Sequence, residues 1–384
     1  MMVSRMPDIT GQYEQIFAGH VEAGNAVAFS FARHALVAAL TAAGLQPGDE
    51  ILLSPLTCKV VPLAILSLGL KPVYADISPA TLNIDPVHAG SRLSSATRAI
   101  LFQHTYGHPG GVDAVTALAS RHKLFMVEDC AQCMPHCTET YRPGQYGAVA
   151  IFSNNAGKPL SAGSGGVAVT DSAQLASRIR DLRDRLPHWK LAGDLRVSAE
   201  TWLHRHLLRP SLYWTLFDLH RRMAGNYSQR PLDTEITAEI TATARQPSTR
   251  QLRRGLRALR DVADIARHRT ACCADYRAAL GPDAWPGAPY DSGRVPLYYY
   301  PLLSDNKAAL LQRARKSRIE LVPWPVAAPI YPLEHVDELS VYGYRSGACP
   351  QAEALAGGLV GLPTHPRITP AVRRQIIDFL QASH

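Results

Sequence analysis

Long apolar segments are absent from this chain of 384 residues. No run of about 18 or more uncharged apolar residues occurs, which excludes an ordinary membrane-spanning helix. The opening residues, MMVSRMPDITGQYEQIF, lack the apolar centre of a signal peptide. We therefore expect a cytoplasmic protein. Internal repeats and low-complexity tracts are also absent.

Cysteine is sparse, and its pattern argues against a disulfide framework. The seven Cys are odd in number and have no regular spacing, so reduced thiols are expected. Cys130, Cys133 and Cys137, with His136, have a C-x2-C-x3-C spacing that could suggest a metal. No second Cys pair follows at zinc-ribbon spacing, and Cys is often simply buried. The sequence therefore predicts no metal.

The remaining composition is that of a globular protein with an excess of positive charge. Hydrophobic residues make up 46% and charged residues 19%, and the length suits one large domain and a smaller one. The net charge of +8 favours anionic partners. No zinc-finger or RNA-binding motif accompanies the basic residues, so we expect no nucleic acid. An anionic metabolite, a phosphate-bearing cofactor and an acidic membrane surface stay open.

Strand and helix patterns alternate along the first half of the chain. Apolar runs predict strands at 51–53, 71–77, 99–107 and 125–129, and helical patterns occupy parts of 13–45, 60–69 and 113–123. This alternation predicts a doubly wound α/β domain with a mainly parallel sheet. We place it at 1–247, with an atypical helical insertion at about 185–245.

The last third of the chain predicts a smaller α+β domain at 248–384. A long helical pattern covers roughly 249–280 and joins the two domains. It is followed by a strand-like VPLYYYPLL, a helical NKAALLQRARKSR and a closing helix in TPAVRRQIIDFLQ.

Four polar residues follow two predicted strands at the points where these strands end. Asp129 ends FMVED and Gln132 follows it, and Ser153 ends AVAIFS and Lys158 follows it. In parallel sheets, ligands bind at the carboxyl ends of the strands. An acid, an amide, a hydroxyl and an amine gathered there suit pyridoxal phosphate (PLP), which has a ring nitrogen, an aldehyde and a phosphate.

Each of these residues has a chemical role and a plainer alternative. Lys158 can form a Schiff base with an aldehyde, although a loop lysine is usually a surface residue. Asp129 can keep a pyridine nitrogen protonated, or it can be a helix N-cap. Gln132 could reach the edge of the cofactor ring, and Ser153 could donate to the phosphate.

Two further segments could complete the site. Ala32 and Arg33, at the start of a predicted helix, are expected to cradle the phosphate, although a helix-start Arg is often only solvated. His104 ends a predicted strand at the same sheet edge. We give it a substrate contact and a structural hydrogen bond equal weight.

The order of these motifs resembles the DegT/StrS family of PLP-dependent aminotransferases, which act on nucleotide sugars and have fold type I. The resemblance covers roughly 12–180 and 248–380. It rests on GDEILLSP, ILSLGLKPVYADIS, TLNIDP, RAILFQHTYGHP, VEDCAQ, AIFSNNAGK, GSGGVAVTD and GLPTHPRIT, and on Ser248, Gln251, Gly255, Leu256, Leu259, Arg269 and Tyr276.

The resemblance implies a residue-level site and a reaction. Lys158 matches the Schiff-base lysine, Asp129 the partner of the pyridine nitrogen, Gln132 the ring-facing residue and Ser153 a phosphate ligand. Sugar dehydratases of the family have His at the lysine position, so transamination is favoured here. The implied protein is a homodimer with shared active sites that moves an amino group from glutamate to a keto-sugar or a related biosynthetic intermediate.

The chain also departs from the family pattern. The usual Ser-Gly-Thr before the first helix is Phe31-Ala32-Arg33, and Cys58 stands where an aromatic residue often stacks on the cofactor. The family's Asn-Tyr-Arg-Met aligns with 244–247 (Ala-Arg-Gln-Pro), and Asn226 could substitute for its Asn. Ser164 replaces the usual Glu. These changes keep open a different PLP reaction, such as elimination, decarboxylation or carbon–carbon bond formation, and a non-catalytic binding or regulatory role.

Residues 200–225 are an additional departure, because this connection is normally shorter. The segment mixes Trp and Leu with His and Arg. It predicts either extra helices at the dimer interface or over the active site, or an amphipathic surface that meets a membrane or another protein.

Overall fold

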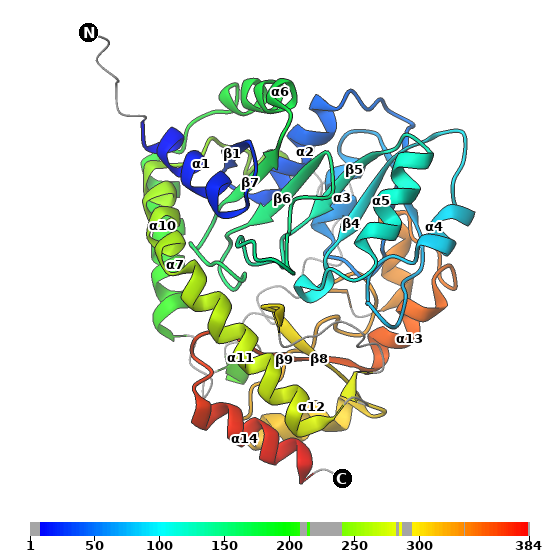
Figure 1. Cartoon of the computed structure of the whole chain (residues 1–384), viewed down its shortest axis with the longest axis vertical. Coiled ribbons are helices and arrows are strands. Elements are labelled where there is room, and N and C mark those ends of the chain that lie inside the picture. The colour runs from blue at the N-terminus through cyan, green and yellow to red at the C-terminus, as the bar shows by residue number, and fades with distance from the viewer. Residues whose placement is uncertain are drawn as a thin grey trace.

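The structure is a computed structural model, and it describes residues 8–207, 213–215, 240–281, 284–285, 294–333 and 335–382. A seven-stranded sheet occupies the upper half of the view in Figure 1, and a two-stranded sheet with its own helices lies below it. Among the described residues, no helix is long and apolar enough to cross a membrane.

The seven-stranded sheet is mainly parallel. Its order is β1 (Asn25–Phe29), β7 (Gly166–Thr170), β6 (Val149–Ser153), β5 (Phe125–Asp129), β4 (Thr97–Gln103), β2 (Glu50–Leu53) and β3 (Lys71–Tyr74). Strands β2 to β6 pair in parallel, whereas β7 is antiparallel to both β6 and β1. The predicted α/β class is confirmed.

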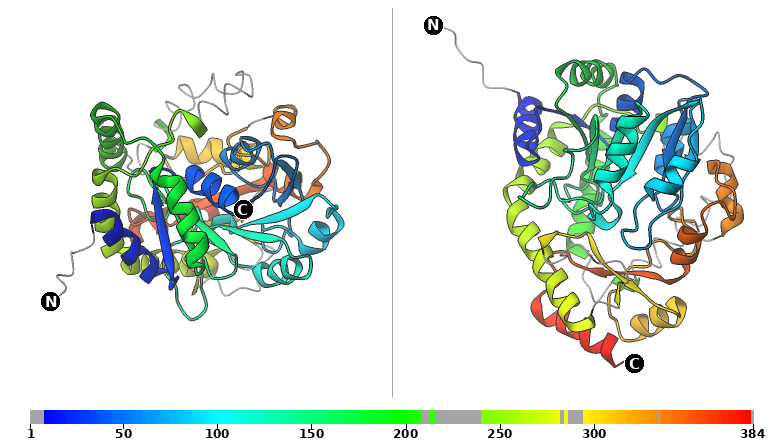
Figure 2. Two further views of the ribbon diagram at one scale, coloured as in Figure 1. Left: turned by 90° about the horizontal axis from the view of Figure 1, so that it is seen from above. Right: turned by 45° about the vertical axis from the view of Figure 1, so that its right-hand side comes forward.

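Helices cover both faces of this sheet (Figure 2). They are α1 (Ile9–His20), α2 (Ala32–Ala42), α3 (Val60–Leu66), α4 (Pro86–Ser91), α5 (Val112–Arg121) and α6 (Ala173–Asp184). Alternate strand residues enter different cores: Leu52 and Met126 pack with α4 and α5, whereas Leu53 and Val127 pack in the main core with α2 and α3. This two-residue alternation decides which polar side chains share a face.

The C-terminal third consists of helices around a strand pair. It contains α10 (Thr249–Arg260), α11 (Val262–Leu280), β8 (Tyr299–Leu303), α12 (Lys307–Lys316), η6 (Val336–Tyr342), α13 (Pro350–Gly358), β9 (Leu359–Pro363) and α14 (Pro370–Gln381). The single helix predicted over 249–280 is wrong, because Asp261 ends α10 and α11 starts at the next residue. The domain boundary at 247/248 stays a prediction.

Two predicted strands are shorter than expected. The strand at 71–77 ends at Tyr74, and the strand at 99–107 ends at Gln103. After Gln103 the chain forms the short 3-10 turn η1 (Thr105–Gly107), in which Tyr106 has a φ of 56°. This turn brings residues 104–107 over the sheet edge.

Part of the predicted helical insertion lies within the described residues. Helix α7 (Leu191–Leu207) packs against the loop after β6, where Arg254 links them by donating to the Ala162 carbonyl and to the Ser198 hydroxyl, each at 2.9 Å. Farther along, the Trp214 indole donates to the Ile319 carbonyl at 2.7 Å. Asn226 and most of 200–225 lie outside the described residues.

Candidate active site

Strand register brings the predicted site residues to one edge of the sheet. Asp129 pairs with Gln103 on β4 and with Ile151 on β6, and Ser153 pairs with Gly166 on β7. Because β7 is antiparallel to β6, its first residue lies at the edge where the parallel strands end. Asp129, Ser153 and the start of β7 are therefore neighbours, as expected for a ligand edge.

Asp129 is a buried carboxylate beside the predicted lysine. Its side chain is 8% exposed, and Oδ1 accepts a hydrogen bond from the Ala131 N–H at 2.9 Å. Burial raises the pKa of Asp129, and the Ala131 N–H and the positive charge of Lys158 act in the opposite direction. No helix begins after Asp129, so the alternative of a helix N-cap does not hold.

Lys158 is half-buried in a loop that closes on itself between β6 and β7. Backbone hydrogen bonds join Asn154 to Gly165 and Ala156 to Gly163, each at 3.0 Å. The loop is also held from the C-terminal third of the chain, because the Tyr298 hydroxyl donates to the Gly157 carbonyl at 2.7 Å. The Lys158 Nζ lies 5.9 Å from the centre of the Tyr298 ring. Lys158 is thus an ordered residue at the site, unlike a solvated surface lysine.

The start of α2 lies directly against β7. A Cβ on Gly166 would come within 2.2 Å of the Ala32 nitrogen, so only glycine permits this approach. The N-cap residue, Phe31, makes no side-chain capping bond, and the first backbone N–H groups of a helix have no partner within it. Ala32 thereby lies next to Ser153, the residue that pairs with Gly166. This arrangement suits an anion such as phosphate.

Arg33 follows on the first turn of α2. Its guanidinium carbon lies 5.2 Å from the centre of the Phe31 ring, in the range of a cation–π contact. Both residues belong to the segment 31–33, for which the sequence predicted a departure from the family pattern.

Gln132 and His104 lie at the edge but are engaged in contacts within the protein. The Gln132 Oε1 accepts from the Tyr106 N–H at 2.7 Å and thereby holds η1. His104 is fully buried, and its Nε2 lies 2.9 Å from the Glu128 Oε2. Of the two roles considered for His104, the structure favours the structural hydrogen bond over substrate contact.

Cys58 lies on the loop after β2 at the same edge. The Lys59 N–H donates to the Tyr331 carbonyl and the Tyr331 N–H donates to the Thr57 carbonyl, each at 2.8 Å, so Tyr331 is joined to the loop on both sides of Cys58. The half-buried Tyr331 ring lies 6.3 Å from the Trp324 ring. An aromatic residue, Tyr331, thus lies beside Cys58.

The structure adds residues that sequence reasoning missed. Glu128 is fully buried and accepts three backbone N–H groups, from Gly144, Tyr146 and Gly147, at 2.7–3.0 Å. Its position one residue before Asp129 was a usable signal, because adjacent strand residues point to opposite faces. Tyr298, 140 positions after Lys158 in the chain, gave no such signal.

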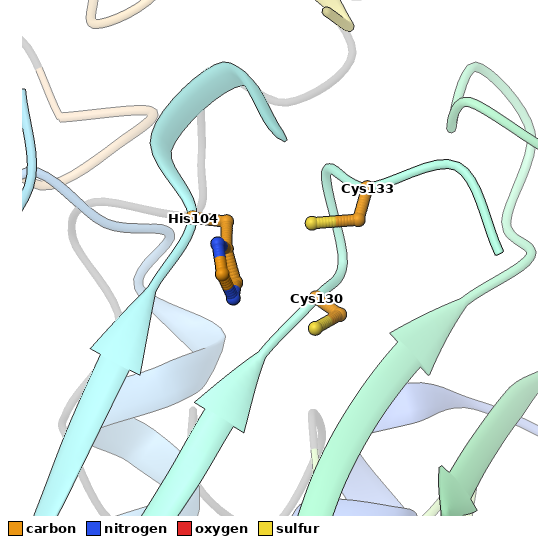
Figure 3. A group of neighbouring side chains, drawn as sticks. All are labelled: His104, Cys130 and Cys133. Atoms are coloured by element: carbon orange, nitrogen blue, oxygen red, sulfur yellow. The ribbon is translucent and has the colours of Figure 1, made fainter. Parts of the chain in front are cut away.

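The cysteine motif is only partly reproduced. Donor atoms of His104, Cys130 and Cys133, all buried, lie within 4.8 Å of one another (Figure 3). Cys137 and His136, which complete the spacing in the sequence, are not members of this group.

The described residues fit PLP at three points. Lys158 supplies an amine for the aldehyde, and Asp129 supplies a buried carboxylate for the pyridine nitrogen. Ser153 and the start of α2 supply a hydroxyl and backbone N–H groups for the phosphate. All three points lie at one sheet edge.

Comparisons with known proteins agree with this geometry. The sequence model of the DegT/DnrJ/EryC1/StrS aminotransferase family matches residues 5–186. The spore coat polysaccharide biosynthesis protein SpsC of Bacillus subtilis is 34% identical over 63% of this chain and 61% of its own length. The dTDP-3-amino-3,4,6-trideoxy-alpha-D-glucose transaminase of Streptomyces venezuelae is 37% identical over 46% of this chain and 47% of its own. The chain thus matches less than two thirds of the length of these curated relatives.

The resemblance of the fold extends over the whole chain. The crystal structure of S. venezuelae DesV, in complex with a ketimine intermediate, superposes with a TM-score of 0.73 at 25% identity and covers 99% of this chain and 91% of DesV. The resemblance predicted from the motifs is therefore confirmed over residues 5–186, which match the sequence model of the DegT/DnrJ/EryC1/StrS aminotransferase family, a family that uses pyridoxal phosphate.

Proposed function

We propose that this protein is a PLP-dependent aminotransferase that moves an amino group from an amino-acid donor, glutamate, to a keto-sugar or a related keto intermediate. The observation that carries the proposal is that Lys158 and Asp129 lie at one edge of the sheet, where burial raises the pKa of the carboxyl and the lysine charge partly offsets that effect.

In this proposal each residue has a defined task. Lys158 holds the cofactor through a Schiff base, and Asp129 keeps a proton on the pyridine nitrogen. When bound, PLP supplies an electron sink that makes the proton on the donor's α-carbon acidic. Lys158 would also serve as the positioned acid–base group that moves this proton. Ser153 and the N-terminus of α2 hold the phosphate in place.

The proposed class of amino-group acceptor is inferred from the names of the curated relatives. The S. venezuelae relative is named as a transaminase of a dTDP-linked sugar, and the net charge of +8 favours an anionic, nucleotide-linked acceptor here. A homodimer with shared active sites completes the proposal, as the family resemblance implies. Cytoplasmic localisation stays a prediction.

The deciding experiment is a visible spectrum of the purified protein with PLP, before and after borohydride reduction. We expect an absorption band that borohydride converts into a covalent adduct, and peptide mapping should locate the adduct at Lys158. Lys158→Ala should lack the adduct, whereas Lys316→Ala, at an exposed lysine that ends α12, should retain it. An adduct on another lysine, or none, would overturn the assignment.

The reaction type needs a second measurement. Glutamate added to the PLP-loaded enzyme should remove the absorption band and release an equimolar amount of 2-oxoglutarate. If Lys158 carries the cofactor but none of the amino acids tested releases its keto acid, the alternative of another PLP reaction replaces transamination. The altered Phe31–Arg33 segment and Cys58 are the observations that favour this second candidate.

A further inference from the structure

A buried cluster of metal-ligating side chains lies under the turn that carries Asp129 and Gln132. We propose that His104, Cys130, Cys133 and Glu128 form a structural site for a single zinc ion. Figure 3 shows the cysteines on the turn after β5, facing His104 from the end of β4. The proposal does not depend on the aminotransferase activity.

The distances suit a tetrahedral ion. Donor atoms of His104, Cys130 and Cys133 all lie within 4.8 Å of one another. With Zn–S bonds of about 2.3 Å and Zn–N bonds of about 2.0 Å, tetrahedral ligand atoms are about 3.3–3.8 Å apart. The three donors therefore need to move inward by about 1 Å at most.

Glu128 is not one of the three residues in that group, but it contacts two of them and would supply the fourth ligand. Its Oε2 lies 2.9 Å from the His104 Nε2 and 3.9 Å from the Cys130 Sγ. Zinc would take the place of the proton that the histidine and the carboxylate now share. The carboxylate is already oriented by the backbone N–H groups of Gly144, Tyr146 and Gly147, the outer-shell support typical of metal ligands.

Charge and burial favour zinc over other ions. His104 and Glu128 are fully buried, as is Cys130, and Cys133 is 3% exposed. Two thiolates offset the charge of the ion, and the three N–H groups stabilise the Glu128 carboxylate, so the assembly can be buried without an unpaired charge. Binding releases the two thiol protons, and the proton between the His104 Nε2 and Glu128 is displaced as well. Two sulfur ligands with one nitrogen and one oxygen in a tetrahedron select zinc over calcium or magnesium.

The position of the site gives it a function. Cys130 and Cys133 immediately follow Asp129 and Gln132 in the chain. An ion held by the two sulfurs would fix the turn on the face of the sheet that Glu128 occupies. Asp129 lies on the opposite face. Zinc would thereby keep the cofactor-binding carboxylate in one orientation.

The test measures zinc in the whole protein, produced with zinc in the medium and dialysed against EDTA. We expect an equimolar amount of zinc by mass spectrometry. Because the site is closed, replacement by Co²⁺ should need unfolding and refolding with that ion alone, and the product should show the visible absorption bands of a tetrahedral cobalt–thiolate site. Wild-type protein that holds less than a tenth of an equivalent of zinc after both production and refolding with zinc would overturn the proposal.

Variants locate the ion. Cys130→Ala and Cys133→Ala should each lose most of the zinc, whereas Cys137→Ala, at the half-buried cysteine outside the cluster, should retain it. If Cys137→Ala loses as much zinc as the others, the assignment is wrong. The PLP adduct at Lys158, measured on the same samples, separates this proposal from the function, because each can hold when the other fails.

Discussion

Two adjacent carboxylates on β5, Asp129 and Glu128, have opposite surroundings. Asp129 accepts one backbone N–H and faces Lys158, and burial raises its pKa. Glu128 accepts three backbone N–H groups and contacts His104 on the other face of the strand. Three backbone donors fix the Glu128 carboxylate in a structural position, whereas Asp129, with one backbone donor, retains acceptor capacity for the cofactor. The strand thus separates a structural face from a chemical face.

The largest expected effect comes from exchanging each carboxylate for its amide. Asp129→Asn should lower the transamination rate by about 10²–10³-fold, because it removes the charge that holds the pyridine proton. Its free energy of unfolding should change little. Glu128→Gln should instead lower the free energy of unfolding by about 3 kcal/mol, because the amide presents an N–H₂ to backbone donors and to His104.

Steady-state kinetics and urea unfolding of both variants measure this contrast. If Asp129→Asn and Glu128→Gln lost the same activity and had the same free energy of unfolding, the proposed division into a chemical and a structural carboxylate would be wrong. Borohydride adduct formation on Asp129→Asn serves as the control that the cofactor still binds.

The next largest effect is expected where the backbone of β7 touches the start of α2. Gly166→Ala should weaken PLP binding and cost about 1–3 kcal/mol of stability, because the new Cβ would lie 2.2 Å from the Ala32 nitrogen and push α2 away from β7. Gly19→Ala, on α1 with nothing within 4 Å, is the matched control and should be neutral or stabilising by about 0.4–1 kcal/mol. PLP titration and thermal unfolding are the measurements. If Gly166→Ala binds PLP with unchanged affinity, the close approach of Gly166 to Ala32 is not needed for phosphate binding.

Two buried histidines, His34 and His108, predict a pH dependence of the free energy of unfolding. Burial lowers the pKa of His34 and of His108 to about 3 in each case. The unfolded chain binds their protons below its pKa of about 6.5 while the native state does not. Each should therefore destabilise the protein by about 1.4 kcal/mol per pH unit as the pH falls below about 6.5. His34→Gln should reduce this slope in urea unfolding between pH 6.5 and 5, and an unchanged slope would contradict the prediction.

The smallest effect is expected at the link between the lysine loop and the C-terminal third. Tyr298→Phe removes the hydroxyl that donates to the Gly157 carbonyl and should lower kcat by about two- to tenfold, the equivalent of one hydrogen bond. Tyr300→Phe is a suitable control, because that side chain is buried on β8, away from the lysine loop. If Tyr298→Phe changes only KM, the tyrosine acts on substrate binding and not on the loop.

Much of the fold followed from the sequence because its strands are buried on both faces and its helices alternate with them. The α/β class, the parallel sheet and the clustering of Asp129, Ser153 and Lys158 at one edge were all predictable from apolar runs that end in polar residues. The separation of α10 from α11 at Asp261 could not be predicted, because the apolar pattern continues through this residue and the geometry of the helix end depends on packing.

The sequence by itself determined which residues can do chemistry: a lysine, an aspartate and a helix start, each following a strand. Only the tertiary structure decided which of the edge residues are engaged elsewhere. His104 and Gln132 had the right chemistry and the right edge, but their side chains bond to Glu128 and to the Tyr106 backbone. The reason is physical: strand periodicity fixes the face of each side chain, whereas its partner comes from a segment far away in the chain, and local pattern does not contain that information.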